Sequence, residues 1–308
     1  MKNGNKKGIR RKRRGFRIGI LLIGFALAAG LLAGLLCLTE RHRQRIQELA
    51  AIETVEILPE KQVAVTEQEV ETKPTAEAGE AAAPEYLESL SGLEPGQIIS
   101  KEQLDFSNLD RYFMCWEIER GDNLFQRING KSYQENDAVP LESLRYLKMP
   151  HYNFDGDIQV GELIVNQDVV EDIFLIFMEL FEAEYQIQSM YLIDNYWTGD
   201  PETSDSASID ANNTSAFCFR QATGSGKLSN HAYGRAIDLN PQQNPYVSYS
   251  TGKPKWYHEN ASDYIDRDTG LAHMVTHEDL AYQVFTKYGF RWGGDWNNPK
   301  DYQHFDRN

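Results

Sequence analysis

Cysteine is scarce in this chain, with three residues in 308. That number excludes the disulfide-rich scaffolds that hold small secreted domains together. Cys37 lies inside a long apolar run, so only Cys115 and Cys218 could meet in a folded region. The sequence leaves their pairing open, and we interpret them as two buried free thiols.

Clustered basic residues are missing from most of the chain. Nine of the 31 Lys and Arg fall in residues 1–17, which contain no acid. The remainder therefore has 22 bases (31 − 9) against 46 acids, a net charge of −24. Contacts to phosphate backbones need clustered Lys and Arg, so we predict no nucleic-acid partner.

Charge is absent from residues 18–38, which are apolar throughout. About 20 residues at ~1.5 Å rise cross a bilayer core of roughly 30 Å. The basic head at 1–17 predicts a cytoplasmic N-terminus and an extracytoplasmic body. A cleaved signal peptide is the alternative, but its apolar region is shorter and ends in a small-residue cleavage site. The segment Leu36-Cys37-Leu38-Thr39 offers no such site, so we predict an uncleaved single-pass anchor.

Aromatic residues are absent between residues 58 and 84, where Glu, Ala, Thr, Val and Pro dominate. Such a segment buries too little apolar surface to offset its ordering entropy. We therefore assign residues 39–100 to a disordered stalk and residues 101–308 to the folded domain. The composition places the start of folding only within residues 86–110.

Two helices are expected in the folded domain. Apolar residues recur at i, i+3, i+4 and i+7 over 169–185, which predicts a core-facing helix with Asp168 as its N-cap. A second helix is expected over 276–288, with Asp279 in capping-box spacing to the first residue and Gly289 as the terminator.

Short strands are expected around these helices. Residues 157–160 and 163–165 suggest a hairpin flanked by Gly156 and Gly161, and residues 190–194 suggest a further strand.

A polar segment follows at 199–215, rich in Asp, Ser, Thr and Asn, and we predict a surface loop. Residues 216–220 alternate as in a strand, with Cys218 and Arg220 on one face.

Two histidines and an aspartate stand out as candidate metal ligands. His231 and Asp238 are separated by a bend at Gly234, and His304 lies near the C-terminus. These are the ligand types that zinc takes when a fourth position stays open for water. Asp301, three residues before His304, is placed to take a proton from that water. Taken singly, each residue also suits an ordinary structural role, such as a turn-capping aspartate.

Two aromatic residues close to this segment, Trp296 and Tyr302, are expected to form apolar walls of the site. The residues 292–294 (Trp-Gly-Gly) predict a close backbone approach.

The spacing Ser229-x-His231-x-x-Gly234-x-Ala236-x-Asp238, followed by Asp301-x-x-His304, resembles the signature of the VanY-like zinc D-alanyl-D-alanine carboxypeptidases. This family shares its fold with VanX-type dipeptidases, phage L-alanyl-D-glutamate endopeptidases and the Hedgehog signalling domain. The resemblance covers roughly residues 112–305, with weaker support at 127–133, 161–166 and 212–217. It implies an α+β fold, in which helices flank an antiparallel sheet.

The resemblance also implies roles for individual residues. His231, Asp238 and His304 would bind Zn²⁺, Asp301 would be the general base, and Arg220 would face the substrate. Cys218 stands where related sequences have a polar residue, and on the face of Arg220 it would line the cleft.

The function implied is removal of the terminal D-alanine from peptidoglycan stem peptides, outside a bacterial cell membrane. An endopeptidase that cuts inside the stem peptide and a non-catalytic zinc-bearing binding module are the alternatives. The presence of Asp301 disfavours the binding module. The oligomeric state stays open.

Overall fold

The computed structural model describes residues 86–308. The predicted basic head, the anchor at 18–38 and most of the stalk lie outside the described residues. Within 86–308, no helix combines the length and the apolar character needed to cross a membrane.

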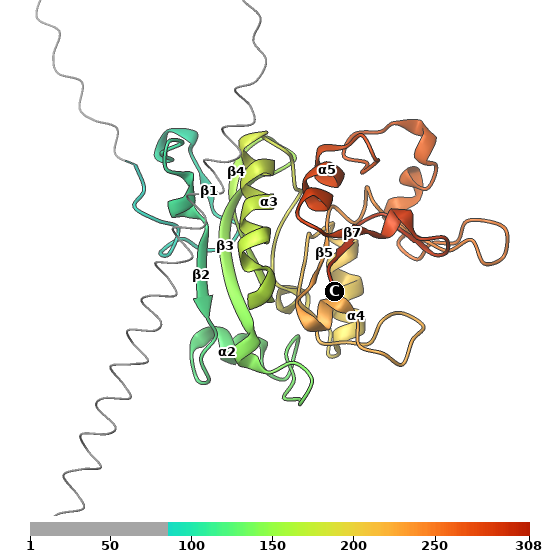
Figure 1. Cartoon of the computed structure of the whole chain (residues 1–308), viewed down its shortest axis with the longest axis horizontal. Coiled ribbons are helices and arrows are strands. Elements are labelled where there is room, and N and C mark those ends of the chain that lie inside the picture. The colour runs from blue at the N-terminus through green and yellow to red at the C-terminus, as the bar shows by residue number, and fades with distance from the viewer. Residues whose placement is uncertain (1–85) are drawn as a thin grey trace, which may run out of the picture. The chain divides into compact units, whose positions relative to one another are not determined.

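The described chain is an α+β fold with antiparallel sheets, as predicted (Figure 1). The strands are β1 (Ile98–Ile99), β2 (Met114–Glu117), β3 (Leu144–Tyr152), β4 (Ile158–Asn166), β5 (Ala236–Asp238), β6 (Tyr246–Val247), β7 (Arg291–Trp292), β8 (Lys300–Asp301) and β9 (His304–Asp306). The α-helices are α2 (Asn123–Ile128), α3 (Val170–Glu182), α4 (Pro201–Asp210) and α5 (Leu280–Lys287).

The largest sheet has the order β1-β4-β3-β2. Its central pair, β3 and β4, is in register from Leu144 opposite Asn166 to Tyr152 opposite Ile158. Helix α3 lies between this sheet and the C-terminal part of the chain, where it contacts α5 (Figure 1). Leu90 is fully buried and β1 pairs with β4, so packing begins before residue 101.

Strand β4 runs unbroken through the segment predicted to be a hairpin, so that prediction was wrong. Gly161 lies in mid-strand, where a Cβ would come within 2.2 Å of Met190 Cε and 3.0 Å of His151 Nδ1. The glycine therefore serves close packing rather than a turn. The chain reverses earlier, at residues 153–157, where Gly156 has a φ of 84°.

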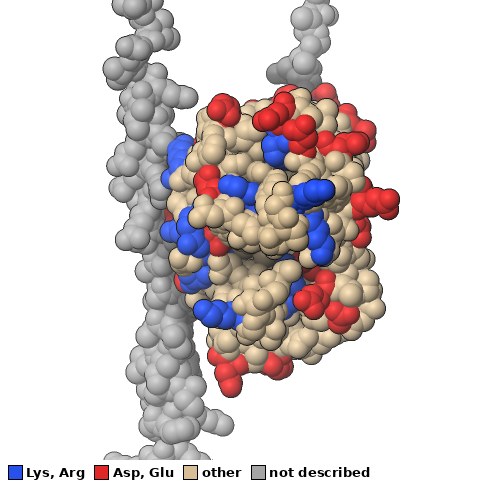
Figure 2. Space-filling model, turned by 90° about the vertical axis from the view of Figure 1, so that its right-hand side faces the viewer, with Lys and Arg blue, Asp and Glu red and all other residues tan. Residues whose placement is uncertain are grey.

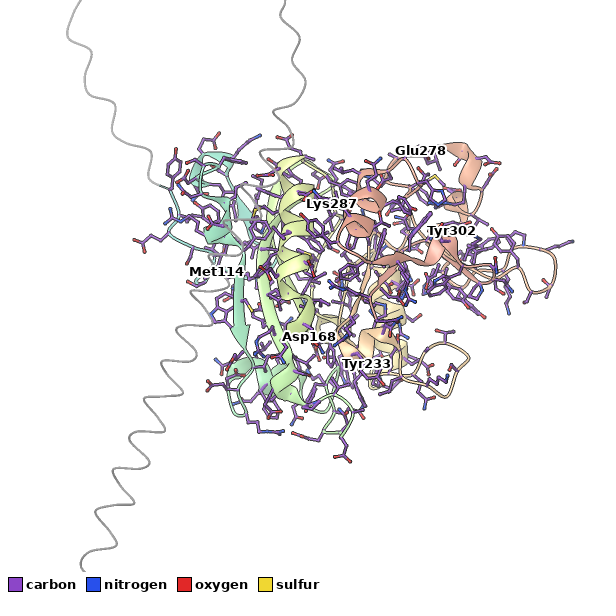
Figure 3. The ribbon with its side chains drawn as sticks, in the orientation of Figure 1. Met114, Asp168, Tyr233, Glu278, Lys287 and Tyr302 are labelled. Atoms are coloured by element: carbon purple, nitrogen blue, oxygen red, sulfur yellow. The ribbon has the colours of Figure 1, made fainter. Side chains whose placement is uncertain are left out.

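The predicted core helix is confirmed as α3, with Ile173, Phe177 and Leu180 buried. Asp168 is not its N-cap, because the turn before the helix is capped by Asn166, whose side chain accepts from the Asp168 amide. The Asp168 carboxylate instead forms an ion pair with Arg235 at 2.6 Å. Asp168 precedes α3 and lies near Tyr233 (Figure 3).

The polar segment 199–215 is not a loop, since it contains α4. Asp200 caps this helix by accepting from the amides of Glu202 and Thr203, and Pro201 occupies the first turn. These are standard helix-start signals. The helix lacks an apolar stripe, and periodicity therefore gave no sign of it.

The two short strands predicted at 190–194 and 216–220 are also wrong. Residues Ile193–Tyr196 form a 3₁₀ helix, and Met190 makes a single bridge to Thr214. The segment 216–220 is not part of a regular strand ladder. Its amides reach different partners, such as the His231 carbonyl for Cys218.

Helix α5 begins one turn later than predicted, with Asp279 rather than Thr276 as its N-cap. It ends before Gly289, whose φ is 81°, as expected. Both described cysteines are free thiols, as we interpreted them. Cys218 is buried, whereas Cys115 is exposed, contrary to expectation.

Candidate metal and catalytic site

A short 3₁₀ turn, η6 (Asn230–Tyr233), positions His231. Ser229 caps the turn by accepting from the His231 amide, and Gly234 ends it with a φ of 64°. A Cβ on Gly234 would lie 2.6 Å from the Asn166 amide nitrogen, so no other residue fits there without a shift. The chain then enters β5, which carries Asp238.

Strand pairing supplies the third residue. β5 and β9 are antiparallel, and their register places Asp238 directly opposite His304. The pair closes a sheet of order β5-β9-β7 near the C-terminus. Residues separated by 66 positions thus meet across two neighbouring backbones.

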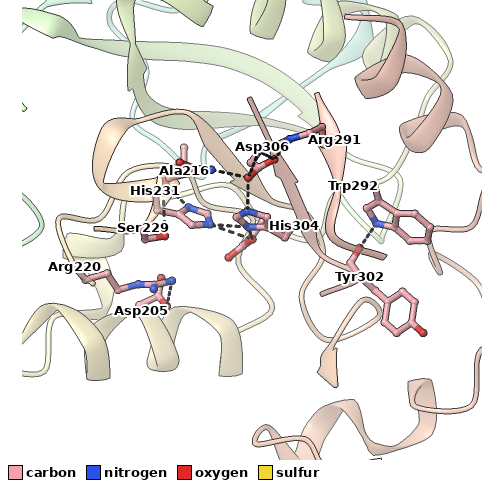
Figure 4. Close-up of polar contacts among 12 residues, drawn as sticks. Asp205, Ala216, Arg220, Ser229, His231, Arg291, Trp292, Tyr302, His304 and Asp306 are labelled. Atoms are coloured by element: carbon pink, nitrogen blue, oxygen red, sulfur yellow. Dashed lines mark hydrogen bonds and ion pairs between the residues drawn. The ribbon is translucent and has the colours of Figure 1, made fainter. Parts of the chain in front are cut away.

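The three side chains converge on one point, and all three are buried (Figure 4). His231 Nε2 lies 3.2 Å from Asp238 Oδ1, and His304 Nδ1 lies 3.0 Å from the same oxygen. The two ring nitrogens are 3.1 Å apart. Among residues 86–308, this is a group whose ligand atoms lie close enough to hold a metal ion together.

Both rings have polar partners on their far sides, which favour tautomers with the proton on the outer nitrogen. His231 Nδ1 lies 2.5 Å from the Ala216 carbonyl, which can only accept, so Nδ1 carries the proton. His304 Nε2 lies 3.7 Å from the Asp306 carboxylate. Asp306 is itself held by Asn230 at 2.6 Å and by Arg291 at 3.0 Å. Metal-binding histidines usually have such outer partners.

When His304 is neutral, these tautomers leave three lone pairs facing one another with no donor between them, and when His304 is protonated its Nδ1 donates to Asp238 at 3.0 Å. A tetrahedral zinc with bonds of ~2.0–2.1 Å would place its ligand atoms roughly 3.3 Å apart, close to the separations seen here. The raised pKa of His304 also indicates that this group of side chains attracts positive charge. Burial alone would lower that pKa, but hydrogen bonds to Asp238 and Asp306 raise it to about 10. The residues therefore fit a divalent metal ion.

Asp301 lies in β8, opposite Tyr246 of β6, and lines the same pocket as the three candidate ligands. Its side chain is buried, and Oδ1 has no hydrogen-bond partner. Burial, followed by the nearby charge of Asp238, raises its pKa from 3.8 to about 7. A Cβ on Gly293 would lie 2.5 Å from the Asp301 carbonyl oxygen, which explains the glycine expected to allow a close backbone approach.

The pocket has a volume of about 620 Å³. Its lining includes Lys227, from the loop before η6, and three aromatic residues, Tyr246, Tyr257 and Trp296. Figure 2 shows this side of the molecule hollowed between two lobes, with acidic and basic side chains both present. The volume suits a ligand as large as a short peptide.

Residues 223–307 match a family model described as D-alanyl-D-alanine carboxypeptidase. This match supports the resemblance to the VanY-like D-alanyl-D-alanine carboxypeptidases over the C-terminal part of the chain. The matched segment contains His231, Asp238, Asp301 and His304. No curated protein and no solved structure matches the chain.

Arg220 lies just outside the matched segment but lines the same pocket. Its Nη2 pairs with Asp205 of α4 at 2.7 Å, and its Nε is buried without a partner. Burial would lower the pKa of Arg220, but the Asp205 carboxylate outweighs that effect and raises it. Sequence reasoning missed Asp205 because its helix was taken for a loop; the Asp200-Pro201 start could have revealed that helix.

Two expectations about the walls of the site were wrong. Cys218 is buried beside α4, with Sγ 3.6 Å from the Pro201 carbonyl, and does not line the pocket. The Tyr302 ring points away from the two histidines (Figure 4) and lies 4.3 Å from the Arg267 guanidinium. Trp296 does line the pocket, with its ring centroid 5.2 Å from that of His304.

Proposed function

We propose that the protein is a zinc-dependent D-alanyl-D-alanine carboxypeptidase, which releases the terminal D-alanine of peptidoglycan stem peptides. The family match over residues 223–307 supports the reaction class. The observation that carries the proposal is the convergence of His231, Asp238 and His304 beside the unpartnered carboxyl of Asp301. A non-catalytic metal site would not need that buried acid.

Zinc held by His231, Asp238 and His304 would supply Lewis-acid chemistry, lowering the pKa of water and polarising the scissile carbonyl. Asp301 takes a proton from the attacking water while the water oxygen bonds to the carbonyl carbon. The carbon–nitrogen bond then breaks, and Asp301 passes the proton to the leaving nitrogen. The products are a shortened peptide carboxylate and free D-alanine.

Arg220 stabilises the negative charge that develops on the carbonyl oxygen. Its guanidinium is held in one orientation by Asp205 at 2.7 Å and by the Gln221 carbonyl at 3.2 Å. These contacts leave Nε–H, which is buried and unpartnered, for the substrate.

The location is part of the proposal. The apolar run at 18–38 and its basic flank would anchor the chain in a bacterial membrane with the C-terminal domain outside. The stalk, predicted over 39–100 and ending earlier because packing begins before residue 101, would then hold the catalytic domain near the outer membrane face, where stem peptides lie. We also infer that the α+β domain shares the fold of VanX-type dipeptidases and Hedgehog domains.

Mass spectrometry of muropeptides tests the proposal. Full-length protein loaded with zinc should release one D-alanine from a stem pentapeptide, and a chelator should stop the release until zinc is restored. Cleavage inside the stem, for instance after L-alanine, would replace carboxypeptidase by endopeptidase. No cleavage by metal-loaded protein would favour a binding module.

A further inference from the structure

Three residues that line the pocket each have a buried polar atom without a hydrogen-bond partner: Arg220 Nε, Asp301 Oδ1 and Gln303 Oε1. A buried polar group without a partner is destabilising, so native structures rarely keep one without a reason. The first two atoms belong to residues with roles in the proposed reaction. Gln303 has no such role, and neither the metal site nor the proposed steps explain it.

The backbone at Gln303 is fixed next to the candidate metal ligands. It lies in the turn between β8 and β9, two residues after Asp301 and directly before His304. Its backbone carbonyl accepts from the Leu239 amide at 2.9 Å, which ties the turn to the end of β5. The residue is 4% exposed and lines the pocket.

The three unpartnered atoms comprise one donor and two acceptors. A peptide bond and an attacking water offer the matching set, namely a carbonyl oxygen, an amide N–H and a water O–H. Arg220 suits the carbonyl oxygen and Asp301 suits the water. The remaining acceptor, Gln303 Oε1, then matches the remaining donor, the amide N–H.

We propose that Gln303 Oε1 accepts a hydrogen bond from the scissile amide N–H of the substrate, an inference that rests on the proposed peptidase function. The bond strengthens during the reaction, because the nitrogen gains positive charge as it takes the proton from Asp301. Removing an interaction that is stronger in the transition state lowers kcat more than it raises KM.

The test compares an amide substrate with an ester analogue in which oxygen replaces the scissile N–H. Zinc-loaded full-length protein and its Gln303→Met variant are assayed on both. The variant should lose about 10- to 100-fold in kcat/KM on the amide, mostly in kcat, which is the range for a hydrogen bond to a group that becomes charged. Its kcat/KM on the ester should stay at the wild-type level.

Two controls separate this role from a structural one. Gln303→Glu keeps an acceptor oxygen and should retain the wild-type ratio of amide to ester activity. Gln243→Met makes the same change at another buried glutamine with an unpartnered Oε1, one that does not line the pocket, and should leave the ratio unchanged. Gln303→Leu replaces the Met variant if the latter does not fold.

Equal losses on amide and ester would overturn the inference, because the side chain would then act without the N–H. A weaker zinc affinity in Gln303→Met would overturn it as well, by assigning the residue to the metal site. If wild-type protein cleaves neither substrate, the proposed function fails and takes the inference with it.

Discussion

Replacing Asp301 with asparagine should stabilise the metal-free protein while removing its activity. The change keeps the shape of the side chain and deletes its charge. Asp301 is buried, Oδ1 has no partner, and the charge of Asp238 is close enough to raise its pKa. The ionised form is therefore held in the fold at a cost in free energy.

The cost follows from the pKa, which rises from 3.8 to about 7. Three pKa units at ~1.36 kcal/mol each give roughly 4 kcal/mol. Between these two values the folded state keeps a proton that the unfolded state has released. The free energy of unfolding therefore falls as pH rises from about 4 to 7, and the full cost is present above pH 7.

His304 adds a second slope, which both proteins share. Its pKa is raised to about 10, so its stabilising contribution is complete below pH 6.5 and is lost as pH rises toward 10. The comparison of wild type with Asp301→Asn at each pH removes most of this common term. The difference in unfolding free energy should grow with pH and level off above about pH 7.

Urea unfolding of chelator-treated wild type and Asp301→Asn, at pH 5 and pH 8, measures this difference. The variant should be the more stable protein at pH 8, with a smaller advantage at pH 5. In the zinc-loaded state it should keep its metal and lose about 10²–10⁴ in rate, the usual effect of losing a general base. A variant no more stable at pH 8 would refute the account of Asp301 burial, and normal turnover would refute its catalytic role.

Three further variants test the framework of the site. Deletion of residues 304–308 removes one histidine ligand and should abolish zinc binding, as measured by metal analysis; retained zinc would show that the ligand set is wrong. Asp205→Asn breaks the buried pair with Arg220 and should destabilise the protein by about 3–5 kcal/mol in urea unfolding. An unchanged urea midpoint would mean that solvent reaches the Asp205–Arg220 pair. Gly234→Ala places a Cβ against Asn166 at a φ of 64°, which should cost more than about 1 kcal/mol and weaken zinc binding. Wild-type zinc affinity in that variant would show that the bend at Gly234 is not needed to position the metal ligands.

The site was more predictable from sequence than the fold around it. The ligand types, their spacing and the bend at Gly234 placed His231, Asp238 and His304 together, and the structure brings them within 3.2 Å. Which aromatic rings face the pocket was harder to predict, because the direction of a ring depends on neighbours that are distant in sequence. Tyr302 faces Arg267 for that reason.

The missed elements share a physical cause. Helix α4 has no apolar stripe, since it presents Asp205 to Arg220 and serines to the interior. The segments 190–194 and 216–220 have strand-like patterns, but their backbone groups bond to several different segments. Alternating apolar and polar residues predict that one face of a segment is buried. They do not indicate which other segment its backbone pairs with.

The features that make the site reactive also work against folding. His231 Nε2, His304 Nδ1 and Asp238 Oδ1 lie 3.0–3.2 Å apart with at most one proton among them. Arg220, Asp301 and Gln303 each bury an unpartnered atom. The β3–β4 pair and the buried face of α3 must supply enough packing to hold these groups in place. A divalent cation removes the largest of the conflicts, so metal binding and stability should be coupled in this protein. Under the proposed function, a bound substrate and the attacking water would pair with the remaining unpartnered atoms, as expected of a site that is preorganised for its reaction.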